Sequence, residues 1–196
     1  MTELDEHGRN LAERQLWLNA EDLAGIGGLM ARWLEGNLSY QPAYYGSAPD
    51  EETAELVPVL AALNRAGFVT EFSQPGIQLT NGSAQRAAVG GFCDDAMLLN
   101  LKVATFGTDL VMLRFASGDT GEGSVVVTLD EREEYTFLGR TEGPDDLEHG
   151  YGEDLSPAGL TALIDAWQIH LFDPVWGRND LLWPLLTDTV ELLTPR

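Results

Sequence analysis

Hydrogen-bonding side chains and two arginines gather in two stretches that lie far apart along the chain. The first stretch surrounds the turn Ser73-Gln74-Pro75-Gly76, and the second surrounds Asp173-Pro174 and Gly177-Arg178. Amide, hydroxyl and guanidinium groups of these kinds can fix the orientation of a small polar or anionic ligand. If the two stretches meet in the fold, they predict a ligand-binding site. Its candidate residues are Thr70, Ser73, Gln74, Gln85, Arg86, Asp173, Arg178 and Asn179.

The turn itself leaves part of the first stretch unexplained. Pro75 and Gly76 fit the two central positions of a type II turn, where proline presets one φ angle and glycine accepts the positive one. That turn does not require Ser73 and Gln74 before it. Further on, Ser83 to Arg86 read as the polar start of a helix, and a helix N-terminus attracts anions. The alternative is that these polar groups satisfy the backbone of their own loops.

Catalytic chemistry has weaker support in the sequence. No histidine has a serine or cysteine nucleophile at a recognisable spacing; the histidines are His7, His149 and His170. Aspartates are too abundant for one of them to stand out as a general acid or base. A hydrolase or transferase that uses an aspartate near Arg178 is therefore the second alternative function.

We expect neither a metal nor a cofactor. Cys93 is the only cysteine, so it cannot form an internal disulfide, and it reads as a small buried apolar side chain. The segment from Thr141 to Leu155 is rich in acids and contains no lysine or arginine, but its spacing matches no calcium-binding loop. We therefore expect a solvated acidic loop there.

The formal net charge of −21 limits the classes of partner. It argues against direct binding to a nucleic-acid backbone, because the two surfaces would repel each other. Two interpretations of the acidity remain open. It can simply keep the protein in solution, or it can present a surface that mimics nucleic acid and meets a basic protein partner. An acidic protein-interaction or nucleic-acid-mimic protein is therefore the first alternative function.

The sequence also predicts a cytoplasmic protein that does not bind a membrane. No apolar run approaches the roughly 18 residues that a membrane-spanning helix needs. The first six residues are acidic, whereas a signal peptide begins with basic residues and continues with an apolar segment.

The candidate site has to be positioned by one compact domain. The chain has 196 residues, of which 44% are hydrophobic, and we expect a single globular domain over residues 19–196. Residues 1–18 form a polar N-terminal arm that permits a frayed helix or disorder. The expected fold class is mixed α/β (α+β), with one central mixed sheet of about five strands, an antiparallel meander and about five covering helices.

Local signals place the elements of this fold. We expect a helix capped by Asn19, a helix over 51–66 that ends at Gly67, a helix capped by Asp94 or Asp95, a helix opened by Ser156-Pro157 and a closing helix capped by Asn179 or Asp180. The expected strands are 68–72, the meander 110–116, 125–129 and 135–138, and finally 168–172. The tyrosine-rich loop 38–49 is expected to cover a core edge or line a pocket.

Several motifs resemble an uncharacterised family of actinomycete proteins known as a domain of unknown function. They are Asn64-Arg65-Ala66-Gly67-Phe68-Val69-Thr70, Ser73-Gln74-Pro75-Gly76, Gln85-Arg86-Ala87 and Phe172-Asp173-Pro174-Val175-Trp176-Gly177-Arg178-Asn179-Asp180 with Trp183-Pro184. The resemblance extends from Trp17 over nearly the whole remaining chain. It implies an actinomycete source, in agreement with the preference for arginine over lysine, and it brings no activity with it.

Overall fold

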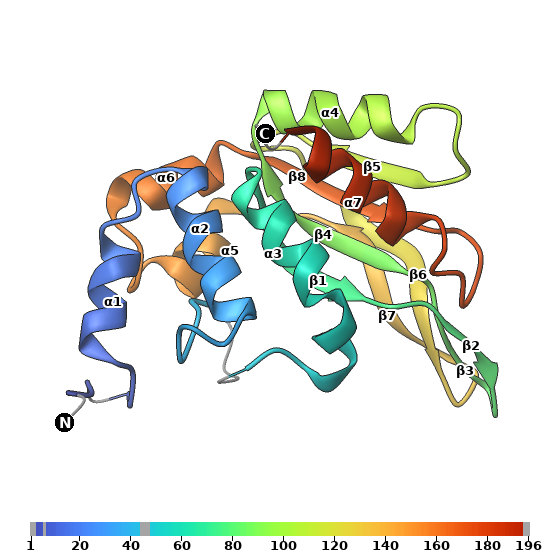
Figure 1. The fold of residues 1–196 in the computed structure, drawn as a ribbon, viewed down its shortest axis with the longest axis horizontal. Helices are drawn as coiled ribbons and strands as arrows, with labels where there is room; N and C mark the ends of the chain where they lie inside the picture. Colours follow the sequence, from blue (N-terminus) through green and yellow to red (C-terminus); the bar gives the residue numbers. More distant parts are fainter. Residues whose placement is uncertain (1–2, 6, 44–47, 194–196) are drawn as a thin grey trace.

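The computed structural model describes residues 3–5, 7–43 and 48–193, and it shows a mixed α+β fold with two antiparallel sheets (Figure 1). The first sheet has the order β1-β4-β8-β5 and contains β1 (Phe68–Gln74), β4 (Ala88–Cys93), β8 (Trp167–Phe172) and β5 (Val111–Phe115). The second has the order β2-β3-β6-β7 and contains β2 (Ile77–Thr80), β3 (Ser83–Gln85), β6 (Glu122–Asp130) and β7 (Glu133–Arg140).

The prediction of one central five-stranded sheet is therefore wrong in detail. One long hairpin belongs to both sheets: β1 continues into β2 after Pro75 and Gly76, and β3 continues into β4 after Arg86 and Ala87. Strands that change sheet at a bend form the corners of packed sheets. The sequence concealed β4 because all its residues are buried and two are glycines, which removes the alternating pattern of a half-buried strand.

The predicted helix from Ser83 is also wrong, because these residues form β3. Asn81 and Gly82 both adopt positive φ angles, 54° and 96°, and they join β2 to β3. Two consecutive positive φ angles are typical of a tight hairpin turn, and Asn-Gly is its strongest sequence signal. The expected helix N-terminus is therefore absent at Ser83, and with it the dipole that would have attracted an anion there.

The prediction of a three-stranded meander is correct for the hairpin of its last two strands and wrong for its first strand, 110–116. β6 and β7 pair as an antiparallel hairpin, with Glu131 and Arg132 at its tip. β5 instead pairs with β8 in the other sheet. Sequence order favours pairing between neighbouring strands, but β5 pairs with a strand near the end of the chain.

Helices cover one face of the first sheet, and the β6–β7 hairpin lies behind the other (Figure 1). Those in front of the sheet are α3 (Val57–Arg65), α4 (Asp95–Thr105) and α7 (Leu182–Leu193). At one end lie α1 (Leu11–Leu18), α2 (Leu23–Leu34), α5 (Pro144–Tyr151) and α6 (Pro157–Ile164), and the 3-10 helix η1 (Glu51–Leu56) precedes α3. No helix of the described residues has the length and apolar character needed to span a membrane.

Capping residues explain where these helices begin. Asp94 caps α4 and Ser156 caps α6, as predicted, through hydrogen bonds to backbone N–H groups. Asp22, rather than Asn19, caps α2, because Asn19 ends the preceding helix α1. Pro58 does not break a helix, since it lies in the first turn of α3.

The acidic segment 141–155, predicted to be a solvated loop, contains helix α5. Pro144 occupies its first turn, and Asp145 and Asp146 follow there. Carboxylates in the first turn stabilise a helix through its dipole, so the charges that suggested a loop favour the start of a helix. Two tyrosines of the predicted loop 38–49, Tyr44 and Tyr45, lie outside the described residues.

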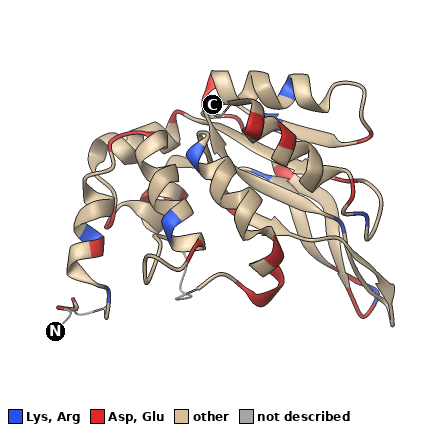
Figure 2. Ribbon diagram, viewed as in Figure 1, with Lys and Arg blue, Asp and Glu red and all other residues tan. Residues whose placement is uncertain are grey.

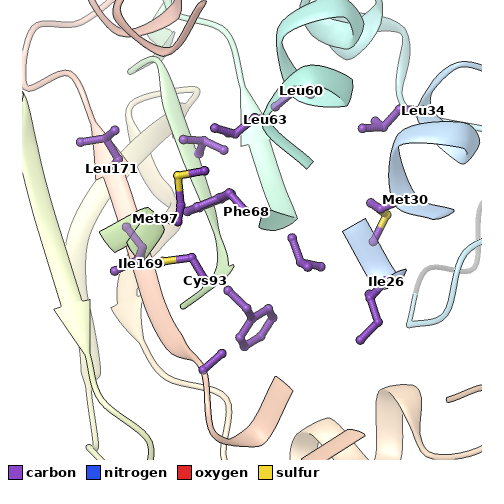
Figure 3. Close-up of a cluster of buried hydrophobic side chains, with 14 of the residues drawn as sticks. Ile26, Met30, Leu34, Leu60, Leu63, Phe68, Cys93, Met97, Ile169 and Leu171 are labelled. Atoms are coloured by element: carbon purple, nitrogen blue, oxygen red, sulfur yellow. The ribbon is translucent and has the colours of Figure 1, made fainter. Parts of the chain in front are cut away.

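The main hydrophobic core lies between the first sheet and the helices. Figure 3 shows Met30 from α2, Leu63 from α3, Phe68 from β1 and Ile169 from β8 in this core. Cys93 lies here too and is buried, and burial raises the pKa of its thiol to about 12. A second, smaller core of Ala88, Val127, Leu138 and Phe172 fills the space between the two sheets.

Helix α1 lies within the predicted N-terminal arm, and it contributes Trp17, which has no exposed surface, to the main core. We expect Trp17→Ala to lower the free energy of unfolding by about 3–5 kcal/mol, the usual cost of removing a buried tryptophan side chain. Urea unfolding of the full chain measures this. The control is Leu16→Ala at the neighbouring exposed position, where we expect a change within about 0.5 kcal/mol. Equal effects of the two substitutions would show that α1 does not unfold with the core.

Candidate functional site

The two polar stretches, whose meeting was the condition for the predicted site, lie together in the structure. We call the region where they meet the strand joint; it comprises residues 74–76, 85–87 and 173–179. The Gly177 N–H donates to the Gln85 carbonyl at 2.9 Å. The Asn179 carboxamide binds both backbone groups of Gly76: it accepts from the N–H at 2.7 Å and donates to the carbonyl at 2.8 Å. Asn179 therefore holds the point where β1 leaves the first sheet.

Gly76 is needed at this point for its small size. A type II turn requires a positive φ at its second central residue, and Gly76 does not adopt one, so the predicted turn type is wrong. A Cβ atom on Gly76 would lie 2.8 Å from the Gly177 carbonyl carbon and 2.9 Å from the Arg178 carbonyl oxygen. The two backbones approach each other so closely that a side chain of any size would push them apart.

Gln74 connects the two sheets. Its side chain is buried and donates through Nε2 to the Arg86 and Val127 carbonyls, both at 2.9 Å. Its Oε1 accepts from the Thr128 hydroxyl, also at 2.9 Å. Because Val127 and Thr128 belong to β6, these bonds join β1 of the first sheet to the second. Gln74 thus has a structural role that its sequence context did not reveal.

Asp173 and Arg178 form an ion pair at the base of the joint. Asp173 is fully buried; one carboxylate oxygen accepts from the Val175 N–H at 2.9 Å and the other from Arg178 Nε at 2.6 Å. Arg178 also lies 3.5 Å from Asp109 through Nη1. The hydrogen bond to Asp173 raises the pKa of Arg178, so the guanidinium stays charged.

Arg86 lies over an aromatic ring. Its guanidinium carbon is 4.4 Å from the centre of the Trp176 ring, a cation–π contact. Nη1 donates to the Val126 carbonyl at 2.9 Å. Partial burial lowers the pKa of Arg86, and the nearby Asp173 carboxylate opposes this effect. Asp173 is therefore the ion-pair partner of Arg178 and acts on Arg86 only through its charge.

Three polar atoms of the predicted set are buried and have no hydrogen-bond partner within the described part of the chain. They are Gln85 Oε1, Arg86 Nε and Arg178 Nη2. The other end of the Gln85 carboxamide donates to Glu52 at 3.2 Å. Buried polar groups almost always have partners, so each exception calls for a water, an ion or a ligand.

The remaining two predicted residues lie elsewhere on β1. Thr70 exchanges two hydrogen bonds with the buried Asn64 side chain, at 2.7 and 3.0 Å. Thr70 and Ser73 also line a cavity of about 160 Å³ beside the outer edge of β1. The predicted set thus divides between two places: six residues at the strand joint and these two at the cavity.

Sequence reasoning missed Glu71, which also lines this cavity. The β1–β4 register shifts between Thr70 and Phe72, so Glu71 is the extra residue of a β-bulge. Glu71 is exposed, yet it lies among enough protein atoms that burial, with a contribution from Glu142, raises its pKa to about 7. The available signal was a lone acid within the apolar run Phe68 to Phe72.

The histidine in β8 has a structural role. Nδ1 of the buried His170 accepts from the Gly139 N–H of β7 at 2.8 Å, which joins the two sheets again. Burial lowers the pKa of His170, so the neutral ring that accepts this bond is favoured. The described residues contain no group of three or more His, Cys, Asp or Glu side chains that could hold a metal ion.

Comparison with known families identifies the family to which the chain belongs. A family model described as a domain of unknown function, DUF6919, matches residues 12–193. The chain belongs to this family. The match covers both polar stretches, so the strand joint and the cavity beside β1 are parts of a DUF6919 domain. No curated protein matches the chain in sequence.

The close backbone contact at Gly76 gives a direct test of the joint. We expect Gly76→Ala to lower the free energy of unfolding by about 1–3 kcal/mol, because its Cβ would overlap the backbone of Gly177 and Arg178. The control is Gly28→Ala inside α2, where a Cβ would meet nothing within 4 Å. There we expect a gain of about 0.5–1 kcal/mol from helix propensity. Thermal unfolding of both variants measures these opposite changes in stability. A Gly76→Ala variant as stable as the wild type would contradict the close contact.

Proposed function

We propose that this DUF6919 domain binds a small polar or anionic ligand at the strand joint, with Arg86 and Arg178 as its charge partners. The observation that carries the proposal is the group of buried polar atoms without partners, namely Arg86 Nε, Arg178 Nη2 and Gln85 Oε1. An anion seated against the two guanidinium groups would give their free N–H donors an acceptor after a small side-chain rotation. Arginine is well suited to this role because its planar fork matches carboxylate and phosphate oxygens.

Local charge at the joint differs from the charge of the whole protein. The chain contains 32 acids and 11 bases, but here two arginines lie beside one buried aspartate. The single negative charge of Asp173 cannot neutralise both guanidinium groups. Two further acids border the joint. Asp109 is 3.5 Å from Arg178 with its side chain 76% exposed, and the exposed Glu52 accepts a hydrogen bond from Gln85. Solvent screens much of the charge of both. The local balance therefore favours an anionic or electron-rich ligand.

Trp176 would assist binding in two ways. Its ring lies against Arg86 and restricts the guanidinium to one side. A side chain held in place before binding loses less conformational entropy when the ligand arrives. The ring also gives the site an apolar wall, which is usual for pockets that take small metabolites.

A second candidate function is an interaction protein with a basic partner. The observation that favours it is the run of exposed acids on η1, where Glu51, Glu52 and Glu55 lie on one projecting element (Figure 2). Capture of a basic protein through this surface would weaken as salt rises, because exposed charges are screened. The enzymatic alternative gains little from Asp173, since both of its oxygens already accept hydrogen bonds.

Ligand screening by thermal shift tests the proposal, with pyrophosphate, citrate and nucleoside phosphates as probes. A bound probe at one hundred times its Kd stabilises by about 2.7 kcal/mol, which corresponds to about 5–10 °C in Tm for a chain of this size. We expect Arg86→Gln to abolish the shift and Arg86→Lys to retain part of it.

The matched control is Arg65→Gln, which removes an exposed arginine that pairs with Glu35 far from the joint. This variant should keep the full shift. The proposal fails if none of the anions raises Tm, or if Arg86→Gln and Arg65→Gln respond alike.

A further inference from the structure

The cavity beside β1 lies at a different place from the strand joint. It is bounded by the outer edge of β1, by α2 and by the segment that leads into η1. Apolar side chains form much of its wall: Met30, Leu34, Leu60, Trp33, Phe72 and Pro49. Its volume of about 160 Å³ is close to the roughly 150 Å³ of an engineered cavity that binds benzene. A molecule of about five to eight non-hydrogen atoms therefore fits.

The charged side chains of the wall carry one sign. Glu71 and Asp50 are acidic, and the lining residues include no lysine or arginine. The uncharged polar groups are Gln41, Thr53, Thr70 and Ser73. The Thr70 hydroxyl already accepts a hydrogen bond from Asn64. The charged residues of the cavity wall are therefore opposite in sign to the two arginines of the strand joint.

Gln41 gives an independent indication that something is missing from the cavity. It is 9% exposed, and its Oε1 atom is buried with no hydrogen-bond partner within the described ranges. A buried carboxamide oxygen without a donor is uncommon in folded proteins. A ligand that donates a hydrogen bond would satisfy it, and one that only accepts would not.

We propose that this cavity binds a small organic ammonium ion, whose charged group lies against Glu71 and donates to Gln41 while its carbon chain contacts the apolar wall. Trp33 and Phe72 place aromatic surface beside the same cavity, and aromatic faces attract organic cations. The β-bulge explains how an acid comes to this position, because it inserts Glu71 as an extra residue into β1. This activity goes beyond the function proposed for the strand joint.

Protonation of Glu71 would control the binding. Its neighbours are Glu142, in the segment after β7, and Tyr151 of α5, and Asp50 lies in the same cavity wall. Burial, and after it the nearby negative charge of Glu142, raise the pKa of Glu71 to about 7. Above that pH the carboxylate is charged and attracts the ammonium group, and below it the attraction is lost. Because Glu71 is exposed, solvent moderates the effect.

The test uses three probes of matched length, n-butylamine, n-butanol and butyrate, titrated into the 15N-labelled full chain and followed by NMR. We expect n-butylamine at pH 8 to shift the amide signals of Thr70, Glu71, Phe72 and Ser73. The alcohol should bind at least tenfold more weakly, and butyrate should not bind there. At pH 6 the affinity for the amine should fall by about threefold to tenfold, as the fraction of ionised Glu71 falls.

Two isosteric variants complete the test. Glu71→Gln should remove the preference for amine over alcohol and the pH dependence. Glu55→Gln, at an exposed η1 position outside the cavity wall, should leave both unchanged. The inference is overturned if the amine and the alcohol bind equally, if Glu71→Gln behaves like the wild type, or if the amine shifts only signals away from residues 70–73. These outcomes do not depend on Arg86, so they are separate from a failure at the strand joint.

Discussion

The contact between Gly76 and the loop that follows β8 is the constraint on which the rest of the architecture depends. At this point the long hairpin leaves the first sheet and enters the second, and Asn179 binds both backbone groups of Gly76. The absence of a side chain on Gly76 lets the backbones meet. Gln74 and His170 then tie the two sheets together through buried hydrogen bonds. Because such bonds are costly to leave unmade, they fix the angle at which the sheets meet.

This arrangement gives β1 two separate surfaces with different chemistry. Its end enters the strand joint, where Arg86 and Arg178 leave donors without partners. Its outer edge borders the cavity, where Glu71 and Gln41 supply acceptors. The β-bulge separates the two surfaces, because the extra residue changes which side chains face the helices beyond it. The two proposed sites, one for an anion and one for a cation, therefore lie at different places along β1.

The parts of the fold that could be predicted from sequence are those set by local chemistry. Asp94 and Ser156 begin helices through bonds to residues only three positions away, so their signals are complete within a short window. The division into two sheets depends on Gly76 and Asn179, which are 103 residues apart, and no local pattern encodes that pairing. Convergence at the joint was suggested by the unexplained polar residues in both stretches, as a condition for the predicted site. The hydrogen bonds of Gln74 were not, because their partners lie on β6.

Net charge and local charge act over different distances, which reconciles the proposed anion site with a chain of charge −21. At physiological ionic strength exposed charges are screened beyond about 8 Å. The many surface acids would therefore slow the approach of the proposed anion but contribute little once it lay against Arg86. Contact interactions inside the joint are screened less, since Asp173 is fully buried and Arg86 packs against the Trp176 ring. The same reasoning favours the cavity as the proposed site for a cation. There the negative net charge of the protein and the nearby Glu71 carboxylate both attract a positive ligand.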